Sequence, residues 1–96
     1  MDQIFSYGIK VSQREAEVLV LMSEGFTSKE IGRQLYLSNL TVDKHKSNLL
    51  AKFNARNSAH LVVKAWKKGI INEHFARVLK QRWVDNDMPA ERSSDL

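Results

Sequence analysis

Apolar residues recur along this chain at intervals of three and four positions, which is the spacing of one face of an α-helix. The intervals predict helices at about 13–24, 28–35, 39–53 and 59–68. We find no alternation of polar and apolar residues over the length of a strand. The chain contains one proline and four glycines, and with so few helix breakers the pattern predicts an all-α fold.

The predicted helix ends carry residues that suit those positions. Ser12 and Thr27 are each followed three residues later by a Glu, which is the spacing of a capping box that satisfies free backbone N–H groups. Ser38 is the expected capping residue of the third helix. Gly25 and Gly69 stand where a glycine commonly ends a helix. The boundaries of the pattern are therefore supported by local chemistry as well as by periodicity.

A chain of 96 residues is enough for one small domain, which we place at residues 11–70. Residues 1–10 are expected to form an N-terminal arm. Residues 71–84 carry apolar positions at helical intervals and predict an extra amphipathic helix. Because an isolated helix of this length is marginal in water, it must pack on this chain, on a second copy or on another protein. The polar stretch 85–96 is predicted to be disordered.

Positive charge is concentrated in the middle of the chain. The formal net charge is +4, but residues 26–68 carry nine basic and two acidic residues, and the segments on either side are slightly acidic. An uneven distribution of this kind produces a field that attracts polyanions. A lysine-rich face that is merely solvated would give the same counts, so charge alone leaves both interpretations open.

What the sequence lacks argues against several classes of protein. There is no cysteine, and therefore no disulfide framework and no thiolate chemistry. No apolar run approaches the roughly 20 residues of a membrane span, and the first residues do not resemble a signal peptide, so we expect a cytoplasmic protein. We find no phosphate-binding glycine loop, nucleophile motif or metal-ligand cluster, and expect neither an enzyme nor a cofactor.

The second and third predicted helices are separated by a turn of about three residues, which is the helix-turn-helix arrangement. In that arrangement the two helices cross, so the facing positions must be apolar and one of them must be small. The apolar positions are Ile31, Leu35, Leu37 and Val42, and the small one is Gly32. Other three-helix bundles with short loops can satisfy the same pattern, so it favours DNA binding without proving it.

Residues 11–70 resemble the LuxR/GerE-type DNA-binding domain of bacterial transcription regulators. The matching segments are VSQREAEVL, EGFTSKEIGRQLYLS, TVDKHKSNLLAKF and ARNS. The resemblance implies four helices, with the third reading the major groove and the fourth often forming a dimer contact. Members usually carry a receiver or ligand-sensing domain as well. The 96 residues leave no room for such a domain, so we expect a stand-alone regulator, with an excised output domain as the alternative.

Two positions depart from the family pattern. Members commonly have Lys or Arg where this chain has Leu40, and often a basic or neutral residue where it has Asp43. A carboxylate on a DNA-reading surface lowers affinity for phosphates, but it can accept a hydrogen bond from cytosine N4. Alternatively, Asp43 holds Lys44, Lys46 or Ser47 in place on the same helix. The sequence leaves these roles open.

The predicted contacts divide into base-reading and phosphate-binding residues. By resemblance, Asp43, Lys44 and Ser47 form the base-reading face. The start of the second helix suits a phosphate because helix N-termini carry free N–H groups and a positive dipole end, although Thr27 also serves as a cap. Exposed lysines are often simply solvated. The expected phosphate contacts are Thr27, Ser28, Lys29, Ser38, Thr41, His45, Lys46, Lys52 and Arg56.

The fourth predicted helix has a second apolar strip formed by Ala59, Val63 and Trp66. A self-complementary patch of this kind would make a two-fold dimer that matches two half-sites of a pseudo-palindrome. Trp66 could instead close the core against the first helix. We favour Trp66 in the core and Val63 at the interface.

Two functions remain open. The first is a sequence-specific DNA-binding transcription regulator that acts as a homodimer on double-stranded DNA. The second is a helix-turn-helix module that docks on RNA polymerase or another regulator, with the 71–84 helix as its contact surface. Replacing Lys44 and Lys46 by Ala distinguishes them, because only DNA binding depends on the basic face.

Overall fold

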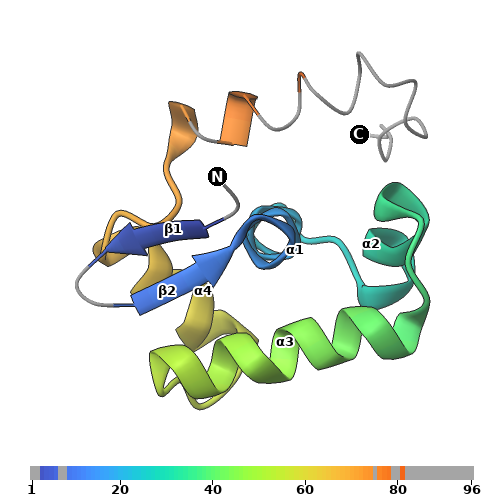
Figure 1. Ribbon diagram of the computed structural model, residues 1–96, viewed down its shortest axis with the longest axis horizontal. Helices are drawn as coiled ribbons and strands as arrows, with labels where there is room; N and C mark the ends of the chain where they lie inside the picture. The colour runs from blue at the N-terminus through green and yellow to red at the C-terminus, as the bar shows by residue number, and fades with distance from the viewer. Residues whose placement is uncertain (1–2, 7–8, 75, 79–80, 82–96) are drawn as a thin grey trace.

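The computed structural model describes residues 3–6, 9–74, 76–78 and 81. In chain order the elements are β1 (Gln3–Ser6), β2 (Ile9–Ser12), α1 (Gln13–Ser23), α2 (Ser28–Leu35), α3 (Asn39–Phe53) and α4 (Ser58–Lys67). In Figure 1, α1 is seen end-on at the centre, and α3 runs below it with α2 near its first turns and α4 near its last. The predicted helix boundaries agree with the observed ones to within one residue at each end, and the all-α fold class is confirmed.

The capping residues act as their spacing predicts. The hydroxyl of Ser12 accepts from the backbone N–H of Glu15, and the Glu15 carboxylate accepts from the Ser12 N–H. Thr27 and Glu30 make the same reciprocal pair at the start of α2. These bonds satisfy N–H groups that have no partner within the helix. Each helix start is therefore fixed by side chains within its own first turn.

A two-stranded hairpin precedes α1 and was not predicted. Strand β1 pairs antiparallel with β2, so that Gln3 lies opposite Ser12 and Ile4 opposite Val11. The strands have four residues each, which is too short for polar and apolar alternation to stand out. Val11 is fully buried, and the hairpin packs against α1 and α3. The expectation of no strand was therefore wrong, and the boundary between arm and domain falls inside β2.

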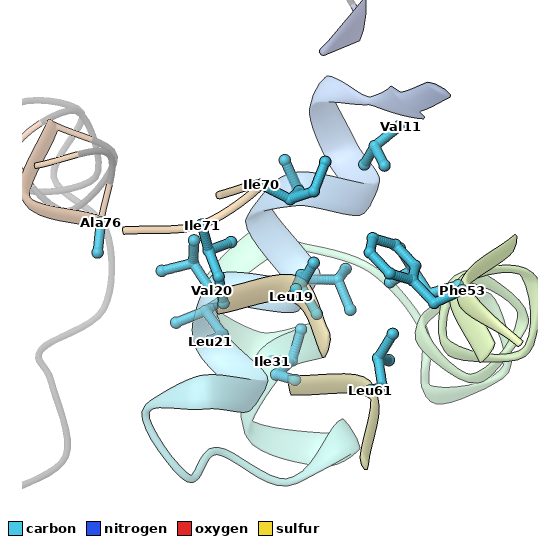
Figure 2. Packing of buried hydrophobic residues seen from close by; sticks show 14 of the residues in the cluster. Val11, Leu19, Val20, Leu21, Ile31, Phe53, Leu61, Ile70, Ile71 and Ala76 are labelled. Atoms are coloured by element: carbon cyan, nitrogen blue, oxygen red, sulfur yellow. The ribbon is translucent and has the colours of Figure 1, made fainter. Parts of the chain in front are cut away.

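The core is built around α1, which is buried on almost every side. Its buried apolar residues are Ala16, Val18, Leu19, Val20 and Leu21. A helix surrounded in this way must be apolar around most of its circumference. Figure 2 shows side chains from α2, α3 and α4 gathered around it, with Ile31, Phe53 and Leu61 among those labelled. Helices α2, α3 and α4 are thus all packed against α1.

The chain after α4 continues the core before it becomes helical again. Ile70 and Ile71 are almost fully buried. Residues 73, 74, 76–78 and 81 have helical backbone, and Ala76, whose N–H donates to the Asn72 carbonyl, is also buried. The extra helix therefore begins two residues later than predicted. Three of its predicted apolar positions, Phe75, Leu79 and Trp83, and the 85–96 tail lie outside the described residues.

The turn between α2 and α3 explains the small residue at position 32. A Cβ atom on Gly32 would lie 2.5 Å from the carbonyl oxygen of Leu37, a backbone atom that cannot move aside. The N–H of Leu37 donates to the Gly32 carbonyl at 2.8 Å, and Tyr36 adopts a left-handed conformation with φ of 59°. The two helices are thus joined by a tight connection that admits no side chain at Gly32, and the orientation of α3 follows from it.

Candidate nucleic-acid interface

Helix α3 has two faces of opposite character. Val42, Leu49 and Phe53 are buried against the rest of the domain. Asp43, Lys44 and Ser47 are exposed, as expected for residues on the opposite side of a helix with 3.6 residues per turn. The three predicted base-reading residues therefore lie together on an accessible surface.

The first turn of α3 places two hydroxyl groups next to each other. The Ser38 side chain caps the helix by accepting from the Thr41 N–H at 3.1 Å. The Ser38 hydroxyl donates to Thr41 Oγ1 at 3.0 Å, and both residues are exposed. With Oγ1 accepting from Ser38, the Thr41 O–H group can donate to a phosphate oxygen. This geometry suits the predicted role of Thr41, whereas the Ser38 hydroxyl already has partners within the protein.

The start of α2 lies beside the reading face because Ser28 contacts α3 directly. The Ser28 hydroxyl donates to Asp43 Oδ1 at 2.7 Å. Thr27 is engaged in its capping box, and Lys29 is exposed. The three residues predicted to meet a phosphate are therefore adjacent to the base-reading face, but the Ser28 hydroxyl already has a partner within the protein.

This hydrogen bond identifies the intramolecular partner of Asp43. The partners considered from the sequence, Lys44, Lys46 and Ser47, all lie on α3, whereas the observed partner belongs to α2 and is 15 positions away. No local spacing rule could have identified the pair, because it depends on how the two helices cross. The bond fixes the orientation of the carboxylate and ties the start of α2 to the second turn of α3.

The basic residues do not all serve the surface. Lys52 donates to the Glu15 carboxylate at 2.7 Å and to the Lys10 carbonyl at 2.9 Å. The Lys64 ammonium donates to the carbonyls of Phe53 and Asn54 at the end of α3. Both lysines therefore have structural partners, and a phosphate contact by Lys52 would compete with an ion pair.

The remaining phosphate candidates differ in exposure. Lys44 is exposed and Lys46 half-buried, and within the described residues neither has an ion-pair partner. His45 is half-buried, and its Nδ1 atom is shielded from solvent without a hydrogen-bond partner among those residues. Arg56 is exposed in the connection to α4, where its backbone N–H donates to His60 Nδ1 at 3.0 Å. Lys44 and Lys46 are thus the basic residues of α3 that can contact DNA without losing an ion pair.

The apolar strip on α4 is accessible. Val63 and Trp66 are 49% and 44% exposed, and Ala59 is exposed as well. The placement of Trp66 in the core was therefore wrong, because Leu61 and Ala65 fill the inner side of α4. All three residues of the predicted dimer interface lie on the outer side.

The part of the chain that the structure describes contains neither a membrane-spanning helix nor a metal-binding cluster. None of its helices combines the length and the apolar character needed to cross a membrane. It also contains no group of three or more His, Asp or Glu side chains placed to hold a metal ion.

Comparison with known proteins gives a consistent result. The profile of the family described as bacterial regulatory proteins, luxR family (GerE), matches residues 10–65. The chain is 42% identical over 59 residues to the transcriptional regulatory protein DegU of Brevibacillus brevis, covering 62% of this chain and 25% of DegU. It is 37% identical over 62 residues to the oxygen regulatory protein NreC of Staphylococcus carnosus, covering 65% of this chain and 29% of NreC.

A solved structure shows the same fold. The VqmA dimer of Vibrio cholerae, described as a LuxR-type receptor in the absence of its target DNA, aligns with a TM-score of 0.63 and 30% sequence identity. The alignment covers 72% of this chain and 33% of the VqmA chain. The chain thus matches about a quarter to a third of the length of these relatives.

The ion pair between Glu15 and Lys52 predicts a pH-dependent stability. Burial of the Glu15 carboxyl opposes its ionisation, but hydrogen bonds from Lys52 and Ser12, with the nearby charges of Lys52 and His45, hold its pKa below the ordinary value. A carboxyl whose pKa is lowered by folding stabilises the folded state above its unfolded pKa of about 4.3. That contribution disappears as the pH falls through the folded-state pKa.

We therefore expect Glu15→Gln, which keeps a capping side chain, to lower the free energy of unfolding by about 1–3 kcal/mol at pH 7. The difference from the native protein should shrink below about pH 4.5, as measured by urea denaturation across pH. Glu73→Gln, at an exposed position, is the matched control and should change stability by less than about 0.5 kcal/mol. An equal loss at pH 3 and pH 7 would show that the ionised carboxylate is not the stabilising species.

Proposed function

The chain belongs to the luxR family of bacterial regulatory proteins, whose profile matches more than half of it, and we propose that it binds specific DNA sequences as a homodimer through α3. The family is one of DNA-binding transcription regulators and not of enzymes. One observation carries the proposal. The face of α3 that is turned away from the core presents Asp43, Lys44 and Ser47 together.

In the proposed complex, α3 enters the major groove with its first turns nearest the bases. Lys44 donates to the O6 and N7 atoms of a guanine, and Ser47 donates to or accepts from a neighbouring base edge. Thr27, Lys29 and the Ser38–Thr41 pair contact the backbone on either side of the groove. These phosphate contacts set the register, whereas the α3 side chains read the sequence.

The remaining basic candidates have smaller parts in the proposal. Lys46 and Arg56 contribute phosphate contacts from the flank of α3 and from the connection to α4. The half-buried His45 of α3 offers the ring edge opposite its shielded Nδ1 atom to the DNA backbone. Lys52 is left out, because it would have to give up the carboxylate of Glu15. The protein therefore binds DNA with fewer cations than its composition implies.

The homodimer is proposed through the exposed strip of Ala59, Val63 and Trp66 on α4. An isologous contact relates the two copies of α3 by a two-fold axis, which matches the symmetry of a pseudo-palindromic site. The VqmA structure is described as that of a dimer, which supports a homodimer here. The same proposal has the chain acting as a stand-alone regulator in the bacterial cytoplasm, where the chromosome lies.

We expect binding to fall steeply with salt concentration, because neutralised phosphates release counterions. Lys46→Ala should weaken binding to all sequences and make the salt dependence shallower by about one unit of slope. Lys44→Ala should cost about 1–3 kcal/mol and relax the preference at one base position. Fluorescence anisotropy with specific and random duplexes over a salt series measures both effects.

The control is a double variant in which the exposed Lys10 and Lys67 are replaced by Ala. It loses the same charge as the double variant Lys44→Ala, Lys46→Ala, but it should weaken DNA binding less. A flat salt response would contradict DNA binding through this face. If the paired α3 variant kept full regulatory activity in cells, protein docking would replace DNA reading as the function.

Asp43 is proposed to trade affinity for specificity. Its removal takes a negative charge from a surface that meets phosphates, so Asp43→Ala should bind random duplex more tightly and discriminate less among sites. Ser28→Ala is the matched variant, because it removes only the hydrogen bond that orients the carboxylate. It should reduce discrimination without tightening random binding. If both variants discriminated among sequences as well as the native protein does, Asp43 would be only a solvated charge.

Val63→Glu should weaken the homodimer, because it buries a charge in an apolar contact. Sedimentation velocity without DNA should show a shift of the dimer towards monomer at micromolar concentration. Leu40→Glu provides the control, since it places the same charge on an exposed apolar residue of a different helix. A sedimentation profile that Val63→Glu leaves unchanged would move the interface away from α4.

A further inference from the structure

Leu40 is the most exposed large apolar residue among the described side chains, with 81% of its surface accessible. It lies in the first turn of α3. Lone apolar residues on a surface are common and need no explanation by themselves. The position of Leu40 relative to the reading face is what makes it informative.

Leu40 stands three, four and seven positions before Asp43, Lys44 and Ser47. Residues at these spacings share one face of a helix. With 100° of rotation per residue, Leu40 falls between Asp43 and Lys44 around the helix and is nearly in line with Ser47. The proposed base-reading stripe therefore includes an apolar side chain at the end nearest the start of the helix.

The chemistry of leucine limits what it can contact there. It has no donor for a phosphate oxygen, and covering a polar base edge with it would leave that edge without a hydrogen bond. The major groove offers one apolar group, the C5-methyl of thymine. The residues that a reading helix brings closest to the bases are those of its N-terminal turns. Thymine is thus the base that gains from a leucine at this position.

We propose that Leu40 is a specificity-determining residue that packs against the methyl group of a thymine close to the base read by Lys44. This inference rests on the proposed function. Residues four apart are separated by about 6 Å along a helix, which is less than two base-pair steps of about 3.4 Å. The thymine is therefore within two base pairs of the position at which Lys44→Ala relaxes the sequence preference.

The test removes a single methyl group from the DNA. A preferred site is selected from a random duplex pool with the native chain, and each thymine of one half-site is then replaced in turn by deoxyuridine. Losing contact with a buried methyl, worth about 0.8 kcal/mol, should weaken binding of the native protein roughly fourfold at one position. Leu40→Ala should bind the thymine and deoxyuridine duplexes equally at that position.

Tyr36→Ala is the matched control. Tyr36 is also strongly exposed, at 71%, but it caps the end of α2 and is not on the α3 stripe, so this variant should keep the fourfold sensitivity. Circular dichroism checks that each variant is folded, which is expected because both side chains are exposed.

The outcomes separate the inference from the function on which it rests. A native protein that selects a site but shows no deoxyuridine effect within two base pairs of the Lys44 position overturns the role of Leu40 and leaves DNA reading intact. The role of Leu40 is also overturned if the deoxyuridine effect persists in Leu40→Ala or disappears in Tyr36→Ala. A native protein that selects no site overturns the proposed function and the inference together.

Discussion

The close approach of α2 to the turn before α3 is the constraint on which the interface depends. Gly32 has no room for a side chain, because a Cβ atom there would collide with the Leu37 carbonyl. The hydrogen bond from Leu37 back to Gly32 holds that contact. Close by, Ile31 of α2 and Val42 of α3 are fully buried. Once the crossing is fixed, the direction of every side chain on α3 is determined by helical periodicity, and the outer stripe faces away from the core.

The basic residues on and around α3 fall into two groups. Glu15, which is almost fully buried, holds Lys52, and Lys64 closes the C-terminal end of α3 through two carbonyl oxygens. Cations near the C-terminus of a helix are stabilised by its negative dipole end. These lysines support the position of α3 from the inside of the domain. Lys44 and Lys46 have no such partner within the described residues, and in the proposed complex they contact DNA.

The sequence was sufficient wherever the determining interaction is local. Helix starts at Ser12, Thr27 and Ser38 depend on atoms three residues apart, and the buried stripe of α3 follows from periodicity. The hairpin was missed because four-residue strands have too little alternation. The contact between Ser28 and Asp43 was missed because it joins residues that only the folded crossing brings together. Trp66 was misplaced because smaller residues already fill the inner side of α4, which composition cannot reveal.

The reading face of this chain is less cationic than the family resemblance implies. By the family resemblance, Leu40 stands where members commonly have Lys or Arg, and Asp43 where they often have a basic or neutral residue. The Ser28 hydroxyl that could meet a phosphate is bound to the Asp43 carboxylate. A face with fewer cations loses non-specific affinity, which comes almost entirely from phosphate neutralisation. In the proposed complex the methyl contact of Leu40, the oriented carboxylate of Asp43 and the ammonium of Lys44 still distinguish bases. The proposed surface would therefore draw more of its binding energy from base identity than from charge, which favours discrimination between sites over affinity for DNA in general.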